Sequence, residues 1–324
     1  MRRRDFITLV GGAAAAWPLA ARAQEYPARS VTMIVLYTAG GSTEILTRIL
    51  AQNLTQRLGQ SFIVENKPGA GTVIGTSAVA KSEPDGYTLL MATPTPMAIN
   101  VRIHKELPYD PARDFTPLVM VAQAPFVLIV NPSLPVNSVK ELIAYAKANP
   151  GKLSYGSGGV GAPHHLYAEL FKSMTGIQLT HVPYKGSVPA LNDVLAGHIE
   201  LMFCDVPPSA GMIQTGKVRA LGVTTKARLA AFPDIPPVGE WVPGFEVAGW
   251  FMVVAPAKTP PAVVAKLHSE MKAVLATPAI KEQIAKMSLL PVESPSVDDM
   301  KTFVKTEIVR WGKVVEAAGI AGTE

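Results

Sequence analysis

Cysteine is almost absent from this chain of 324 residues. Its single cysteine, Cys204, has no partner in the chain with which to form a disulfide. It lies in the apolar, strand-like segment 199–204, where a small buried residue is the expected role. Packing must therefore hold the fold together. A composition of 48 % hydrophobic and 17 % charged residues is that of a globular chain that can fill sizeable cores.

Excess charge is also scarce beyond the N-terminus. The formal net charge is +5, and four arginines against one aspartate in residues 1–23 supply +3 of it. No basic patch interleaved with aromatic residues is present, so nucleic-acid binding is not predicted. No stretch after residue 23 is long and apolar enough to cross a bilayer, and no repeat of fixed period indicates a solenoid.

The N-terminal segment has the features of an export signal. Charged Arg2-Arg3-Arg4 precedes an apolar stretch over 6–19 and the small-residue site Ala21-Arg22-Ala23. We therefore expect residues 1–23 to be a signal peptide that is cleaved near Ala23. The residues around Arg3-Arg4 resemble a twin-arginine signal, although the general secretory route stays open. A membrane anchor is the alternative, but the apolar stretch is shorter than the ~20 residues of a span.

The chain that follows the N-terminal segment alternates strands and helices. β-prone runs and amphipathic runs predict a β-α-β-α-β unit, namely strands 31–36, 62–66 and 87–92 with helices 44–58 and 72–81. A second unit begins at strand 126–130. The sequence therefore predicts an α/β fold with two lobes and a ligand site in the cleft between them. The first lobe is expected to be discontinuous, with residues 24–125 and 248–324, and the second to comprise residues 126–247.

Two glycine-rich loops join a strand to a helix. One is the segment 38–43, and the other is the segment 156–162, after which Pro163 opens a helix. Glycine allows backbone N–H groups to turn toward one point, and a helix N-terminus adds free donors and a positive dipole end. We expect the two loops to face each other and hold a carboxylate. Four or five charge-assisted hydrogen bonds of about 1.5–3 kcal/mol each would suffice for micromolar affinity without an arginine.

Other chemistry is less well supported. Gly156, Gly158 and Gly161 match G-x-G-x-x-G, but the acidic residue expected ~20 positions later is missing, as is a phosphate-binding G-x-x-x-x-G-K motif. Ser157 beside two histidines could suggest a hydrolase, yet no G-x-S-x-G surrounds it. His165 and Glu169 have helical metal-ligand spacing without a convincing third ligand. We therefore predict no catalytic residue, no metal and no cofactor.

Three polar residues outside these loops are candidates for the ligand site. Asp205 ends a predicted strand, where it could contact a polar ligand group or an ordered water. Tyr184 is a candidate aromatic wall or hydrogen-bond partner. Lys185 could pair with an anion or be a solvated turn residue, and both interpretations stay open.

A series of motifs resembles one known family across the mature chain. The motifs are Thr38-Ala39-Gly40-Gly41, 65–71 (ENKPGAG), 84–90 (PDGYTLL), 155–161 (YGSGGVG), 181–186 (HVPYKG) and 216–224 (GKVRALGVT). With the leader, they resemble the Bug (TctC-type) extracytoplasmic solute receptors of tripartite tricarboxylate transporters.

The resemblance implies a monomeric, periplasmic, non-catalytic receptor with a two-lobed, type II-like periplasmic-binding fold. It would close on a di- or tricarboxylate or an aromatic carboxylate and deliver it to membrane permease subunits. A ligand-sensing partner of a membrane signalling protein is the alternative. The implied ligand contacts are Tyr37, Thr38, Ala39, Gly40, Gly41, Thr43, Thr93, Ser157, Gly158, Val160, Gly161, Ala162 and Asp205, with Glu44, His165 and Tyr184 as secondary candidates. Ala39 and Glu44 replace the proline and aspartate usual in the family's first loop.

Overall fold

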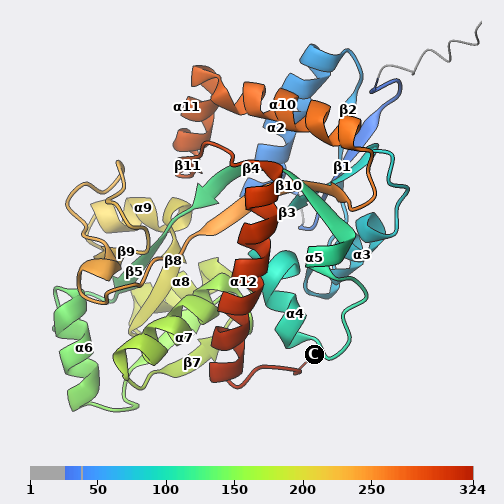
Figure 1. The fold of residues 1–324 in the computed structure, drawn as a ribbon. Helices are drawn as coiled ribbons and strands as arrows, with labels where there is room; N and C mark the ends of the chain where they lie inside the picture. The colour runs from blue at the N-terminus through green and yellow to red at the C-terminus, as the bar shows by residue number, and fades with distance from the viewer. Residues whose placement is uncertain (1–25, 38, 324) are drawn as a thin grey trace, which may run out of the picture.

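The computed structural model describes residues 26–37 and 39–323, which form two mixed β-sheets covered by helices (Figure 1). The predicted signal peptide and Thr38 lie outside the described residues. Within the described part of the chain, no helix is long and apolar enough to cross a bilayer.

The first sheet has six strands in the order β11-β4-β10-β3-β1-β2. Its strands are β1 (Val31–Val35), β2 (Phe62–Asn66), β3 (Thr88–Ala92), β4 (Phe115–Ala124), β10 (Gly249–Pro256) and β11 (Leu290–Pro291). β1 pairs in parallel with β2 and β3, whereas β10 and β11 pair antiparallel with their neighbours. The continuous apolar run in β1 follows from its central place, because side chains on both of its faces are buried.

Helices cover both faces of this sheet. Met33 and Val35 pack on one side against α2 (Ser42–Leu58), α10 (Pro261–Ala276) and α11 (Pro278–Lys286). Ile34 and Leu36 point to the other side, which is covered by the elements α3 (Val73–Ala80), η2 (Thr95–Ile99) and α12 (Val297–Ala317). Successive side chains of a strand point to opposite faces, so a single run of apolar residues serves two cores.

The second sheet has five strands in the order β7-β6-β8-β5-β9. They are β5 (Phe126–Val130), β6 (Ser154–Ser157), β7 (Thr180–Pro183), β8 (Leu201–Asp205) and β9 (Arg219–Val223). One of its cores includes side chains of α6 (Val139–Ala148) and α7 (Pro163–Thr175), and the other includes side chains of α8 (Ser187–Ala196) and α9 (Val206–Gln214). Cys204 is fully buried in the second of these cores, as its sequence context predicts.

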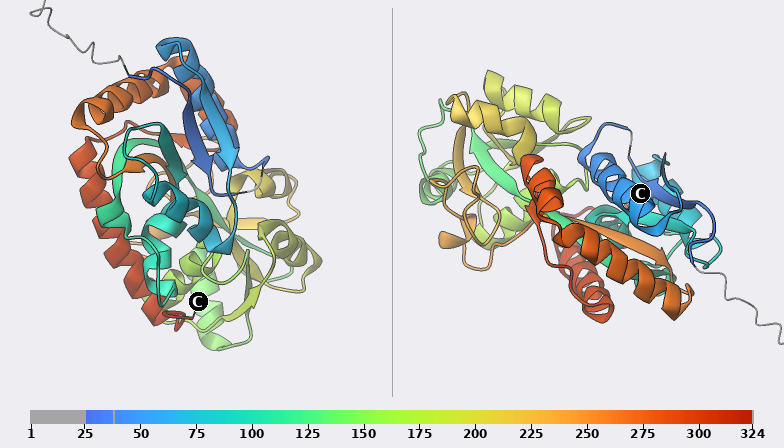
Figure 2. Two further views of the ribbon diagram at one scale, coloured as in Figure 1. Left: turned by 90° about the vertical axis from the view of Figure 1, so that its right-hand side faces the viewer. Right: turned by 90° about the horizontal axis from the view of Figure 1, so that it is seen from above.

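The chain crosses between the sheets twice. β4 leads directly into β5 through Pro125, and the proline-rich segment 224–248 leads from β9 back to β10 (Figure 2). Both crossings fall where the sequence places the boundaries of a discontinuous first lobe. That the two parts act as separate lobes stays a prediction, because Ile99 and Ile103 share a core with the second sheet.

Most predicted strands and helices are present within one or two residues of their expected bounds, but several elements were not predicted, and β4 and α9 are the longest of them. β4 contains Pro117, a residue that normally argues against a central strand. α9 begins with Pro207 and Pro208 and contains Gly211, so its sequence resembles a loop. Prolines are tolerated in the first turn of a helix because the N–H groups there have no partner within the helix.

Helix α12 packs against both halves of the molecule. Its Trp311 is 1 % exposed, stacks on Tyr167 of α7 with ring centroids 5.5 Å apart, and donates a hydrogen bond to buried Glu307. Glu307 also accepts a hydrogen bond from the indole of Trp250 on β10, at 3.0 Å. This long helix therefore joins the return strand of the first sheet to the core of the second.

We expect the substitution Trp311→Ala to lower the free energy of unfolding by about 3–5 kcal/mol, since it removes a fully buried aromatic ring. Urea denaturation measures the change. The matched control is Val309→Ala on the same helix, where the side chain is 59 % exposed and the expected change is under about 0.5 kcal/mol. A loss of less than 1 kcal/mol for Trp311→Ala, on the order of an exposed substitution, would show that α12 does not join the two halves.

Candidate functional site

A cavity of about 620 Å³ lies between the two sheets. Both sheets contribute to its wall through the ends of their strands and the loops that follow. Its lining residues include Tyr37, Ser42, Thr43, Gly71, Thr72, Thr93, Thr95, Asn100, Ile103, Phe126, Gly158, Val160, Gly161, Ala162, His164, Ser187, Asp205, Trp250, Phe251 and Leu289.

Several helices begin at this cavity. The first residues or N-caps of α2, α3, η2, α7, α8 and α9 all belong to its wall. None of these six N-termini is capped by a side-chain hydrogen bond. The backbone N–H groups in the first turn of a helix have no intrahelical partner, and each helix carries a partial positive charge at this end. Pro163 in α7 and Pro207 and Pro208 in α9 lack an N–H, so these two helices offer fewer free donors than they would without proline. The cavity therefore has the electrostatics of an anion site that is built from the backbone.

The side chains of the wall do not supply that positive charge. Among the described lining residues, none is a lysine or an arginine, and Asp205 is the one acidic residue. Its carboxylate lies 2.8 Å from Nε2 of His164, and its side chain is 34 % exposed. Burial raises the pKa of Asp205, but the hydrogen bond and charge of His164 and the hydroxyl of Ser187 outweigh it and leave the pKa below its usual value. Asp205 is therefore ionised at neutral pH.

Much of the remaining wall is apolar. Ile103, Phe126, Trp250, Phe251 and Leu289 are the largest apolar residues that line it. A solute that fits this cavity would combine an anionic group, next to the helix starts, with an apolar body.

The first glycine loop contributes less to the wall than the sequence predicts. Tyr37 and Thr43 line the cavity, and the Tyr37 hydroxyl lies 2.8 Å from Oγ1 of Thr93, which also lines it. Ala39, Gly40 and Gly41 are exposed residues outside the wall.

The side chain of Glu44 accepts a hydrogen bond from one backbone N–H group of this loop, so that N–H is not free to bind a ligand. Its carboxylate accepts a hydrogen bond from the N–H of Gly40 at 2.5 Å and another from Arg48 at 2.7 Å. The hydrogen bond from Gly40, together with Arg48, lowers the pKa of Glu44. Glu44 is buried and does not line the cavity, so it supports the start of α2 from outside the wall.

A strained turn lies beside the first loop. Ala70 and Thr72 adopt positive φ angles of 44° and 81°, which are unusual for residues with a Cβ. Asn100 holds this turn, since its side-chain amide donates to the carbonyl of Gly71 at 2.9 Å. Gly71, Thr72 and Asn100 all line the cavity, and strain of this kind is typical of functional sites.

The second glycine loop lies directly on the wall. Gly158, Val160, Gly161 and Ala162 all line the cavity. A side chain at Gly161 would be strained, because its φ is 73° and a Cβ would lie 2.5 Å from Cδ1 of Ile103. The backbone of this loop and the α4 helix (Asn100–Ile103) thus approach each other closely.

Three further predicted contacts, in addition to those of the first loop, lie outside the cavity wall. Ser157 is completely buried beneath the second loop, where its hydroxyl contacts His181 and accepts from the N–H of Gly159. His165 is buried and accepts a hydrogen bond from Gly161. Tyr184 donates its hydroxyl hydrogen to Asp193 instead of facing the cavity. Among the described residues, no group of three or more His, Cys, Asp and Glu side chains is arranged to hold a metal ion.

Sequence reasoning also missed part of the wall. Asn100, Trp250 and Phe251 come from segments without a glycine-rich motif and reach the cavity only through tertiary packing. Gly71 could have been predicted as a lining residue, because it lies in the glycine-containing loop of segment 65–71. For His164 the sequence suggests only a role as a possible partner of a catalytic serine.

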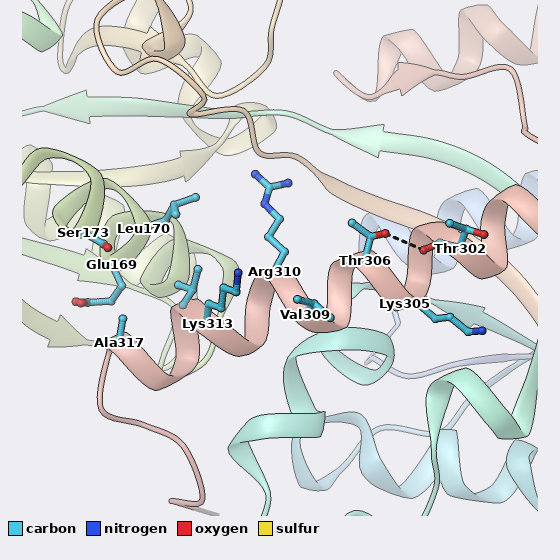
Figure 3. A pocket seen from close by; sticks show the side chains of 11 residues that line it. Glu169, Leu170, Ser173, Thr302, Lys305, Thr306, Val309, Arg310, Lys313 and Ala317 are labelled. Atoms are coloured by element: carbon cyan, nitrogen blue, oxygen red, sulfur yellow. Dashed lines mark hydrogen bonds between the residues drawn. The ribbon is translucent and has the colours of Figure 1, made fainter.

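A second hollow, of about 650 Å³, lies on the outer face between α7 and α12 (Figure 3). Three cationic residues of α12, Lys305, Arg310 and Lys313, line it, and Glu169 of α7 lies at its other side. We call it the outer groove. Neither glycine loop contributes a residue to it, so the cationic side chains and the uncapped helix starts belong to different surfaces.

The sequence matches a family of transporter receptors. Residues 46–320 match the model of the tripartite tricarboxylate transporter family receptors. The chain is 38 % identical over 299 residues to the protein BugT of Bordetella pertussis, which covers 92 % of this chain and 91 % of BugT.

Solved structures agree with the sequence match. The R. palustris protein Rpa4515 with adipate superposes with a TM-score of 0.79 at 41 % identity, over 92 % of this chain and 99 % of that one. MatC from Rhodopseudomonas palustris with bound malate gives a TM-score of 0.75 at 28 % identity, over 90 % and 100 % of the two chains. The expected α/β fold of the periplasmic binding proteins is thus confirmed. The chain belongs to the Bug, or TctC-type, receptors of the tripartite tricarboxylate transporter family, which bind solutes and are not enzymes.

Proposed function

We propose that this protein is an exported, periplasmic receptor that captures a small organic carboxylate in the cavity between its sheets. It delivers the solute to the membrane permease of a tripartite tricarboxylate transporter. The observation that carries the proposal is the convergence of six uncapped helix N-termini on a cavity whose described lining residues include no lysine or arginine. The carboxylates named with two similar structures, adipate and malate, support the same chemistry.

We further propose that residues 24–125 with 248–324, and residues 126–247, act as two lobes that close on the solute. The two sheet crossings at Pro125 and at 224–248 are the natural hinge. Residues 1–23 would direct export and be removed near Ala23.

A thermal-shift screen of small acids tests the proposal. The panel contains hexanoate, adipate, malate and benzoate, and each acid is paired with its neutral amide. Stabilisation by at least one acid at millimolar concentration, and not by its amide, is expected, because only the anion gains from the helix N-termini. Absence of a shift with every acid would contradict the proposed function.

The wall of the cavity also indicates which carboxylates bind. A ligand with one carboxylate and an apolar or hydrogen-bond-donating remainder suits the apolar residues and the ionised Asp205. A second carboxylate on the ligand would be repelled if it approached Asp205. We therefore rank aliphatic or aromatic monocarboxylates and hydroxyacids above di- and tricarboxylates for this chain.

A ligand series of constant length tests this ranking. We expect hexanoate and 6-hydroxyhexanoate to bind at least about threefold more tightly than adipate in isothermal titration, a difference of about 0.7 kcal/mol. The substitution Asp205→Asn keeps an acceptor for His164 and should remove this difference by strengthening the binding of adipate. Asp298→Asn, at an exposed position of α12, is the matched control and should change neither affinity. Tighter binding of adipate to the unmodified protein would refute the ranking.

A substitution in the second loop tests the role of its backbone. A Cβ at Gly158 would lie 3.2 Å from Nδ1 of His164 and 3.3 Å from the carbonyl carbon of Gly186, so a larger side chain must displace the loop. We expect Gly158→Val to weaken carboxylate binding at least tenfold, or about 1.4 kcal/mol. The exposed residue Lys185 does not line the cavity, and Lys185→Ala should change the affinity by no more than about twofold. A greater loss for Lys185→Ala in isothermal titration would show that a cation, and not the backbone, holds the anion.

A further inference from the structure

We propose that His165 and His181 are positioning residues that hold the second glycine loop in its anion-binding shape only while both imidazoles are neutral. Acid would then loosen the loop and release the solute. This inference rests on the proposed function, since the loop is taken to contact the carboxylate.

His165 fixes the C-terminal end of the loop. Its side chain is 3 % exposed, and its Nδ1 lies 3.1 Å from the backbone nitrogen of Gly161, from which it accepts a hydrogen bond. An imidazole nitrogen accepts only when it carries no proton. In the neutral ring the proton is consequently on Nε2, which faces the carboxylate of Glu169 at 3.9 Å. A proton on Nδ1 would place two N–H groups against each other and break this contact.

His181 fixes the N-terminal end of the loop through Ser157. Its Nε2 lies 2.6 Å from Oγ of Ser157. The same Oγ accepts a hydrogen bond from the N–H of Gly159 at 3.1 Å and donates one to the carbonyl of Gly159 at 3.0 Å. Ser157 is completely buried, so the hydroxyl is used within the loop and does not reach the cavity. Two imidazoles thus support the loop at two points, Gly159 and Gly161, on either side of the exposed Val160.

The two rings are stacked on each other. Their centroids are 3.9 Å apart and their planes differ by 5°, and Tyr155 of β6 stacks on His181 at 4.9 Å. Two positive charges at this separation would repel each other strongly in a buried site. The geometry itself therefore disfavours the doubly protonated pair.

The charged groups around the pair offset this only in part, since the charge of Glu169 raises the pKa of both imidazoles without overcoming the effect of burial. Glu169 of α7 is the nearest acid, but it already accepts hydrogen bonds from Tyr155 at 2.5 Å and from Lys172 at 2.7 Å. Glu169 also lines the outer groove on the far side of α7 (Figure 3). Lys172 adds a positive charge near both rings, which opposes their protonation.

The direction of the pH dependence follows from these surroundings. Burial lowers the pKa of His165, and burial together with His165 lowers the pKa of His181 to about 4. If the loop loosens, the imidazoles regain pKa values near the ordinary 6.5. Above pH 6.5 both states are neutral and the affinity does not change. Below about pH 6.5 the loosened state takes up protons more readily than the intact loop, down to about pH 4 at His181, so the affinity falls as the pH falls.

Isothermal titration of hexanoate between pH 7.5 and pH 4.5 tests the inference. The variant His165→Asn keeps an acceptor on Cγ, as Nδ1 is in histidine, but cannot titrate. We expect its affinity at pH 7.5 to lie within about threefold of the unmodified protein. Relative to this variant, the unmodified protein should lose about tenfold in affinity by pH 4.5. The ratio of the two affinities at each pH is compared, because the protonation of hexanoate itself affects both proteins equally. His165→Leu should bind weakly at every pH, because it leaves the Gly161 N–H without its acceptor.

The matched control is His198→Asn at an exposed histidine, which should keep the pH profile of the unmodified protein. Parallel profiles for the unmodified protein and His165→Asn would overturn the inference. Nitrogen-15 NMR of the ligand-free protein measures the protonation of the His165 ring without any ligand. It therefore tests this inference separately from the proposed function. A proton on Nδ1 of His165 at pH 7.5 would overturn the inference even if no carboxylate binds. An unprotonated Nδ1 that gains its proton together with a shift of the Gly161 amide would support it.

Discussion

The site depends on one interaction, the hydrogen bonds that backbone N–H groups at helix N-termini can donate to an anion. β1, β3, β6 and β8 each lead into a helical segment at their carboxyl ends, and β8 runs parallel to its neighbour β6. The two sheets place these ends around one cavity. The fold thereby concentrates partial positive charge without a lysine or arginine among the described residues of the wall, where Asp205 is the one acid and lies beside His164. Binding without a covalent or metal-assisted step is what such a cavity can do, and the family match agrees with it.

Backbone donors bind only while the loops keep their shape, and buried polar contacts maintain it. Asn100 fixes the strained turn at Gly71, and Glu44 fixes the start of α2 through Gly40. The stacked imidazoles of His165 and His181 do the same for the second glycine loop. The shape of these loops therefore depends on hydrogen bonds from side chains, and for Glu44 and His165 those bonds require one particular protonation state.

The sequence predicts the architecture well and the wall of the cavity in part. Apolar runs and glycine loops identify β1, β6 and the starts of α2 and α7, since these signals are local. Asn100 and Trp250 could not be predicted as lining residues, because tertiary packing alone brings them to the cavity. The direction of a side chain is equally non-local. Ser157 is the last residue of β6, as expected, yet its hydroxyl points beneath the loop to a histidine 24 positions later.

Amide NMR with added hexanoate tests the central claim most directly, because it reports on each backbone N–H group. The account predicts that the largest shifts of the amide protons occur at the cavity, in the first turns of α2, α7 and α8. The outer groove, with Lys305, Arg310 and Lys313, is the competing anion site and serves as the internal comparison. Shifts concentrated on α12 at that groove, with unchanged amides at the helix starts, would contradict the account.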